Sequence, residues 1–142
     1  GRRAGPDDVE EGTWALAEIG RAVTGVQFHA SIQRLHAFAR QVASWWAAGN
    51  DVLVTPTITE PPPPLGQFPP GSTKAAEIVP FTLPFNVTGQ PAISLPLYWN
   101  AEGLPIGVQL VAAAGREDLL IRLAAQLEAA RPWADRRPPV SA

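Results

Sequence analysis

The 142-residue chain contains no cysteine, and this absence excludes disulfide bonds and thiolate chemistry. It has no apolar run near the roughly 18 residues that a membrane-spanning helix needs, and no basic-then-apolar signal peptide at its start. Its basic residues form no patch and its formal net charge is −2, so we expect neither nucleic acid nor a membrane as a partner. These absences fit a globular protein of the reducing cytoplasm.

Lysine is almost absent as well, because Lys74 stands alone against ten arginines. A lysine acts as a base only where burial and positive neighbours lower its pKa, and the proline-rich surroundings of Lys74 offer neither. Five serines are present, none of them in the glycine-rich elbow that presents a nucleophile: Ser31, Ser44, Ser72, Ser94 and Ser141. No nucleophile–base pair is visible, and we therefore expect no catalytic residue in this chain.

The residues that are present have the composition of a folded domain, with 46% apolar and 17% charged residues. Residues 11–22 predict a short helix that Thr13 caps. A longer helix is predicted from a cap at Thr24 to a stop at Gly49-Asn50, because apolar residues recur every three or four positions on one face. Those positions are Phe28, Ile32, Leu35, Ala39, Val42 and Trp46.

The second half of the sequence predicts strands. The run Val52-Leu53-Val54 has no polar alternation, which is typical of a strand buried on both faces. Residues 92–99 and 105–113 predict an antiparallel hairpin closed by turn residues 100–103, and 116–130 predict a helix with leucines on one side. The other stretches are a lead-in over 1–10, a proline-rich loop over 60–75, an irregular segment or short helix over 76–91, and a tail over 134–142.

Two weaker patterns leave alternatives open. His29 and His36 lie seven residues apart on one side of the long helix, but metal pairs usually stand four apart and need a third ligand. We interpret them as half-exposed side chains, and we expect no metal and no cofactor. Pro61 to Pro64 match the pattern of peptides that bind aromatic grooves, although a stiff surface loop has the same composition.

Four stretches carry a more specific signal: DVLVTPT (51–57), FTLPFNVTGQPAISLPL (81–97), GLPIGVQLVAA (103–113) and EDLLIRLAAQLEAA (117–130). Their order and spacing closely resemble the C-terminal part of the amidase signature family. TWALAEIGRA (13–22) resembles it too, and suggests bacterial amidases whose relatives include cyclic nylon-oligomer hydrolases. We therefore expect residues 1–142 to be a single partial domain of that family.

The resemblance implies an α/β fold in which helices cover a mixed sheet on both faces. It also implies hydrolysis of a carbon–nitrogen amide bond by a Ser–Ser–Lys triad, with backbone N–H groups holding the oxyanion. The stretches that carry this triad in the family have no match in this sequence, and Lys74 lies on the wrong side of the motif order. We therefore expect the chain alone to be inactive, with the remaining N-terminal part of an amidase as its partner.

The resemblance also gives pocket and structural positions. Relatives that act on the glutamine of charged transfer RNA hold the substrate's amino group with an acid just before the FT element. The matching positions in this chain are apolar, which implies a small neutral or apolar amide as the substrate: Ile78, Val79, Pro80 and Phe81. The positions expected to shape the turn and the strand are Thr57, Thr82, Asn86, Gly89 and Pro91, with Asn86 buried against backbone groups.

Three interpretations follow from the sequence. The first is an amidase fragment, and the second is a non-catalytic module that pairs with another chain through strand edges or its polyproline loop. The third, a complete small enzyme, is disfavoured by the residue inventory. A fragment should show unpaired strand edges and an uncovered apolar face, whereas an independent module should cover both.

Overall fold

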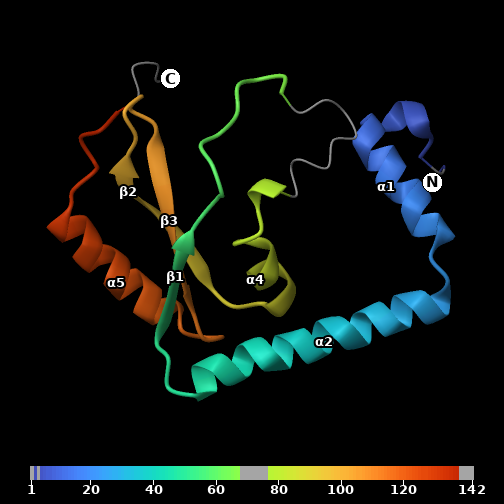
Figure 1. Cartoon of the computed structure of the whole chain (residues 1–142), viewed down its shortest axis with the longest axis horizontal. Coiled ribbons are helices and arrows are strands. Elements are labelled where there is room, and N and C mark those ends of the chain that lie inside the picture. Colours follow the sequence, from blue (N-terminus) through green and yellow to red (C-terminus); the bar gives the residue numbers. More distant parts are fainter. Residues whose placement is uncertain (1, 3, 68–76, 138–142) are drawn as a thin grey trace.

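The structure, a computed structural model, describes residues 2, 4–67 and 77–137. Figure 1 shows a small sheet flanked by one helix, and a long helix that leads away from the sheet to a shorter one near the N-terminus. The elements are η1 (Pro6–Asp8), α1 (Glu11–Ala22), α2 (Gly25–Ala47), β1 (Val52–Pro56), α4 (Leu83–Thr88), β2 (Ala92–Trp99), β3 (Pro105–Ala112) and α5 (Glu117–Ala130). The predicted α/β class is confirmed. No helix among these is long and apolar enough to cross a membrane.

The sheet has the strand order β1-β3-β2, and both pairings are antiparallel. The predicted hairpin is confirmed: β2 and β3 pair from Ala92–Val111 to Trp99–Pro105, with an irregularity between Pro96 and Tyr98. Its turn is stabilised by Asn100, whose Oδ1 accepts the backbone N–H of Leu104 at 2.8 Å. Within the described residues, each outer strand therefore pairs on one side only.

The hydrophobic core lies between the hairpin and α5 (Figure 1). Leu95, Leu110, Ala112 and Leu120 form its buried cluster, and further leucines of α5 pack around them. The apolar stripe of α5 recurs every three or four residues, so one face of the helix covers the sheet. Central strand β3 has the most buried residues, because both of its neighbours shield it.

Helix α2 begins and ends as predicted. The Thr24 hydroxyl accepts the N–H of Gln27 at 3.2 Å, and the Gln27 side chain accepts the N–H of Thr24 at 2.9 Å, which together form a capping box. Gly49, with φ of 95°, turns the chain after the helix. The predicted Thr13 cap is wrong: α1 starts at Glu11 after an extended Glu10, so Thr13 lies within the first turn.

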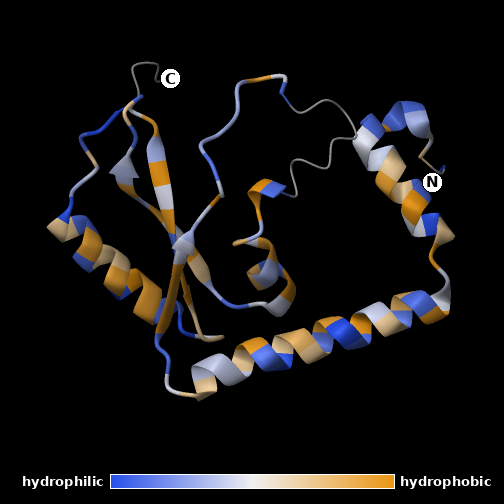
Figure 2. Cartoon of the chain, in the orientation of Figure 1, coloured by the Kyte–Doolittle hydropathy of each residue, from blue (hydrophilic) through white to orange (hydrophobic). Residues whose placement is uncertain are grey.

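The prediction that the first strand is buried on both faces is also wrong. Val54 of β1 is 60% exposed, although Val52 and Leu53 are partly covered. The strand lies at the edge of the sheet, and Val54 is not among the residues that pack against the core, although Val52 on the same face is. Figure 2 shows that apolar residues also continue along α2 and α1, away from the core.

Candidate functional site

A cleft of about 310 Å³ lies between α4 and the sheet. Every residue that lines it is uncharged, and most carry a hydroxyl or an amide. The lining residues are Thr57, Thr82, Phe85, Asn86, Gln90, Ala92, Ile93, Ser94 and Gln109. Three of the predicted structural positions therefore meet at one place, together with three polar residues that the sequence did not single out.

A pair of hydroxyl groups forms one wall of the cleft. Thr57 Oγ1 and Ser94 Oγ lie 2.6 Å apart, and the backbone N–H of Thr57 donates to the Gly107 carbonyl at 3.0 Å. A Cβ atom added at Gly107 would lie 2.7 Å from both hydroxyl oxygens, closer than real Cβ atoms approach. Glycine at 107 is therefore what allows the two side chains to meet over β3.

Gln109 forms the floor of the cleft and is 4% exposed. Its Nε2 donates to Thr55 Oγ1 at 3.0 Å and to the Phe81 carbonyl at 2.8 Å. Both amide hydrogens are thus used, which fixes the plane of the amide and leaves Oε1 as a hydrogen-bond acceptor. The contact with Phe81 also ties β3 to the chain that enters α4.

Helix α4 and the turn after it form the opposite wall. Pro84 lies in the first turn, where its missing N–H costs nothing, and Gly89 ends the helix in the left-handed conformation with φ of 78°. Thr88 Oγ1 donates to the Pro84 carbonyl at 2.9 Å and also contacts Gln90 Oε1. The Pro91 carbonyl accepts the N–H of Ala112 at 3.1 Å, so the turn continues directly into the sheet.

The four predicted pocket residues lie before α4, and none of them lines the cleft. The Val79 carbonyl accepts the N–H groups of Thr82 and Leu83 at 3.2 and 3.0 Å, and the Ile78 carbonyl accepts that of Thr59 at 3.2 Å. Pro80 is exposed. Val79 thus accepts the first N–H groups at the start of α4, and the Phe81 carbonyl orients Gln109.

Asn86 corrects a prediction. It lines the cleft but is exposed, whereas burial against backbone groups at the turn was expected. Its backbone N–H donates to the Thr82 carbonyl at 3.3 Å. The expectation assumed a covered side chain, and no described residue buries that of Asn86.

The histidine pattern gives no metal centre. His29 and His36 are both exposed on α2. In the part of the chain that the structure describes, no group of His, Cys, Asp or Glu residues is placed to hold a metal ion. Lys74 and part of the proline-rich loop lie outside the described residues.

Sequence reasoning missed Ser94 and Gln109. They are register partners in the hairpin, each the polar residue in a mainly apolar strand. A polar residue that recurs at facing positions of a predicted hairpin is the signal that would have found them.

The comparisons with known proteins agree with the fold. The family model described as Amidase matches residues 11–121, so the chain belongs to the amidase family. It is 45% identical to the 6-aminohexanoate-cyclic-dimer hydrolase of Paenarthrobacter ureafaciens over 97% of this chain and 30% of the relative. It is 37% identical to an acylamidase of Rhodococcus erythropolis over 82% of this chain and 25% of the relative.

A solved structure extends the likeness to three dimensions. The 6-aminohexanoate cyclic dimer hydrolase complexed with its substrate matches with a TM-score of 0.89 and 44% identity, over 98% of this chain and 31% of that chain. The chain thus spans about 30% of the length of the relatives it matches. The predicted family, with only part of its length present, is confirmed.

Proposed function

We propose that this chain is the C-terminal part of an amidase that hydrolyses a small, neutral amide. In this proposal the chain supplies core sheet and one wall of the substrate pocket, and the Ser–Ser–Lys triad comes from the remaining part of the enzyme. The observation that carries it is the 45% identity to a 6-aminohexanoate-cyclic-dimer hydrolase together with coverage of only 30% of that relative. Amide hydrolysis is the reaction of the family, so the chain alone is expected to be inactive.

The cleft beside α4 supports a neutral substrate. Its lining residues carry no charge, and the Gln109 Oε1 acceptor and the Thr57–Ser94 hydroxyls are groups that hydrogen-bond an amide. A cyclic dimer of 6-aminohexanoate is joined through amide bonds and has no charged end, so its chemistry fits such a wall. Burial of an unpaired charge would cost far more than burial of an amide that finds partners.

A chimeric hydrolase tests the proposal. It is the Paenarthrobacter ureafaciens enzyme with its matched segment replaced by this chain, and the isolated chain serves as the comparison. We expect the chimeric hydrolase to release free amine from the 6-aminohexanoate cyclic dimer, and the isolated chain to show no turnover. A folded chimera without activity, or turnover by the isolated chain, would contradict the proposal.

The cleft can be tested within the same chimera. Asn86→Asp adds a negative charge to the cleft with almost no change in size, so KM for the neutral substrate should rise about tenfold, the effect of roughly 1.4 kcal/mol. Asn86 is exposed, so the melting temperature should hardly change. Glu102→Gln, in the exposed hairpin turn, is the matched control that removes a charge elsewhere. An unchanged KM in Asn86→Asp would place the substrate outside this cleft.

A further inference from the structure

A second cavity of about 350 Å³ lies where the end of α2 meets α4, and it differs in character from the polar cleft. Its lining is mainly apolar and includes Phe38, Trp45, Trp46, Leu53, Pro84 and Phe85. The aromatic rings are set edge to face: Trp45 and Trp46 have centroids 5.1 Å apart, and Trp46 and Phe85 6.5 Å. We call this cavity the aromatic groove.

Trp46 carries an unmet hydrogen-bond donor beside the groove. The residue is 9% exposed, and its indole Nε1 is buried without an acceptor among the described residues. Buried polar groups in native proteins almost always have a partner, so an orphaned indole N–H indicates that an acceptor is missing. An apolar groove with one buried donor is complementary to an apolar group that is followed by a carbonyl oxygen.

The groove is continuous with an exposed apolar surface along α2. Moving from Trp46 toward the start of the helix, Phe38, Leu35 and Phe28 become progressively more exposed, up to 62% at Phe28. Figure 2 shows apolar residues recurring between polar ones along α2 toward α1. A surface of this kind on one chain marks a site of association.

From these observations we infer that the aromatic groove is the anchor site for the remaining part of the amidase. An apolar side chain of that part fills the groove, and a neighbouring carbonyl accepts the Trp46 N–H. The inference rests on the proposed function, and most of the relatives' length lies outside this chain and is available to cover the groove. The groove and the donor thus act together as one half of an internal interface.

The test compares the chimeric hydrolase with the isolated chain. Trp46→Phe removes the N–H and keeps an aromatic ring. In the isolated chain the donor has no partner, so the change should cost only the packing that the smaller ring loses. In the chimera the same change should shift the unfolding equilibrium roughly fivefold further toward unfolding than in the isolated chain, the effect of losing one ordinary hydrogen bond.

A second pair of variants tests the groove itself. Phe38→Asp places a charge in the groove wall, and Ile121→Asp places the same charge on an exposed position of α5 as a matched control. In the chimera, Phe38→Asp should shift the unfolding equilibrium at least about thirtyfold more than Ile121→Asp, because the charge is buried unpaired. In the isolated chain this difference should largely disappear.

Two results would overturn the inference. The first is equal effects of Phe38→Asp in the chimera and the isolated chain, and the second is a dimer of the isolated chain that Phe38→Asp dissociates. Stability is the readout throughout, so a folded but inactive chimera would contradict the proposed function and leave this test intact. Equal effects of Phe38→Asp in the isolated chain and in an active chimera would contradict this inference and leave the proposed function intact.

Discussion

The sheet unit (β1, β2, β3 and α5) and the helical arm (α1 and α2) differ in how far their apolar residues are buried. Both carry apolar residues at regular spacing, but in the sheet unit Leu110 is 3% exposed, whereas Leu16 in the arm is 70% exposed. The sheet unit covers most of its apolar face within this chain, and the arm leaves most of its face exposed. Amphipathic periodicity therefore identifies the face that a helix buries, but it does not say whether the partner lies in the same chain.

Matched leucine truncations should show the largest difference between the two regions. Leu110→Ala removes a fully packed core side chain and should lower the free energy of unfolding by about 2–5 kcal/mol. Leu16→Ala removes an exposed one and should change it by less than about 0.5 kcal/mol. Urea unfolding followed by circular dichroism measures both. Equal costs would show that the arm is packed in solution and would remove the contrast.

Two glycine substitutions should have opposite signs. Gly107→Ala forces Cβ against the Thr57 and Ser94 hydroxyls and should cost about 1–3 kcal/mol. Gly20→Ala lies in α1 with nothing within 4 Å of its Cβ, so it should stabilise the helix by about 0.5–1 kcal/mol. Thermal unfolding of the two variants measures both changes in stability. A harmless Gly107→Ala would mean that the two hydroxyls do not meet over β3.

The helix caps give a smaller contrast within the arm. Thr24→Ala removes the capping box of α2 and should cost about 1 kcal/mol. Thr13→Ala, inside the first turn of α1, should be neutral or slightly stabilising, because alanine is the better helix former. Helix content by circular dichroism and the urea midpoint report both changes. A larger loss of stability in Thr13→Ala than in Thr24→Ala would indicate that Thr13 caps α1, as the sequence predicted.

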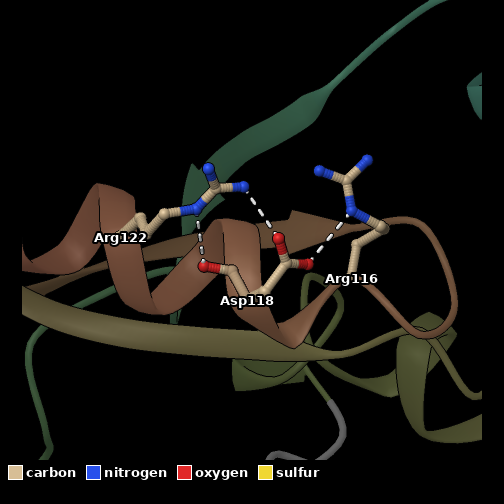
Figure 3. Close-up of polar contacts among 3 residues, drawn as sticks. All are labelled: Arg116, Asp118 and Arg122. Carbon is tan, nitrogen blue, oxygen red and sulfur yellow. Dashed lines mark hydrogen bonds and ion pairs between the residues drawn. The ribbon is translucent and has the colours of Figure 1, made fainter.

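The smallest effect concerns pH and lies on the sheet unit. Arg116 Nε donates to Asp118 Oδ1 at 3.1 Å and Arg122 Nη2 donates to Oδ2 at 2.7 Å (Figure 3). The hydrogen bond from Arg116, with the positive charges of Arg116 and Arg122, lowers the pKa of Asp118 below its usual 3.8. A lowered pKa in the folded state means that the stabilisation is complete above 3.8 and is lost as pH falls through the lowered value.

Asp118→Asn removes that dependence. The variant and the parent chain should differ slightly in stability above pH 3.8 and converge at lower pH, since the carboxylate is exposed and its ion pairs are screened by water. Urea midpoints measured from pH 6 down to acid unfolding provide the test. A difference that grows as pH falls would contradict a lowered pKa of Asp118 in the folded state.

The elements encoded by neighbouring residues were predictable from the sequence. The hairpin of β2 and β3 and the span of α2 from Thr24 to Gly49 follow from alternation, spacing and capping residues. The exposure of Val54 and Asn86 was not predictable, because it depends on which chain covers them rather than on the residues beside them. The Thr57–Ser94 contact joins residues 37 positions apart and was missed for the same reason.

The central place of β3 has a consequence for how the chain is made. Gln109 of β3 bonds to Thr55 of β1 across 54 residues, whereas β2 and β3 are neighbours in sequence. On a ribosome that adds about 5–20 residues per second, β1 therefore waits roughly 3–11 seconds for the strand that pairs with it. During that interval the Val-Leu-Val edge of β1 has no partner strand and can pair with other nascent chains. We expect a chaperone to bind this edge at that stage.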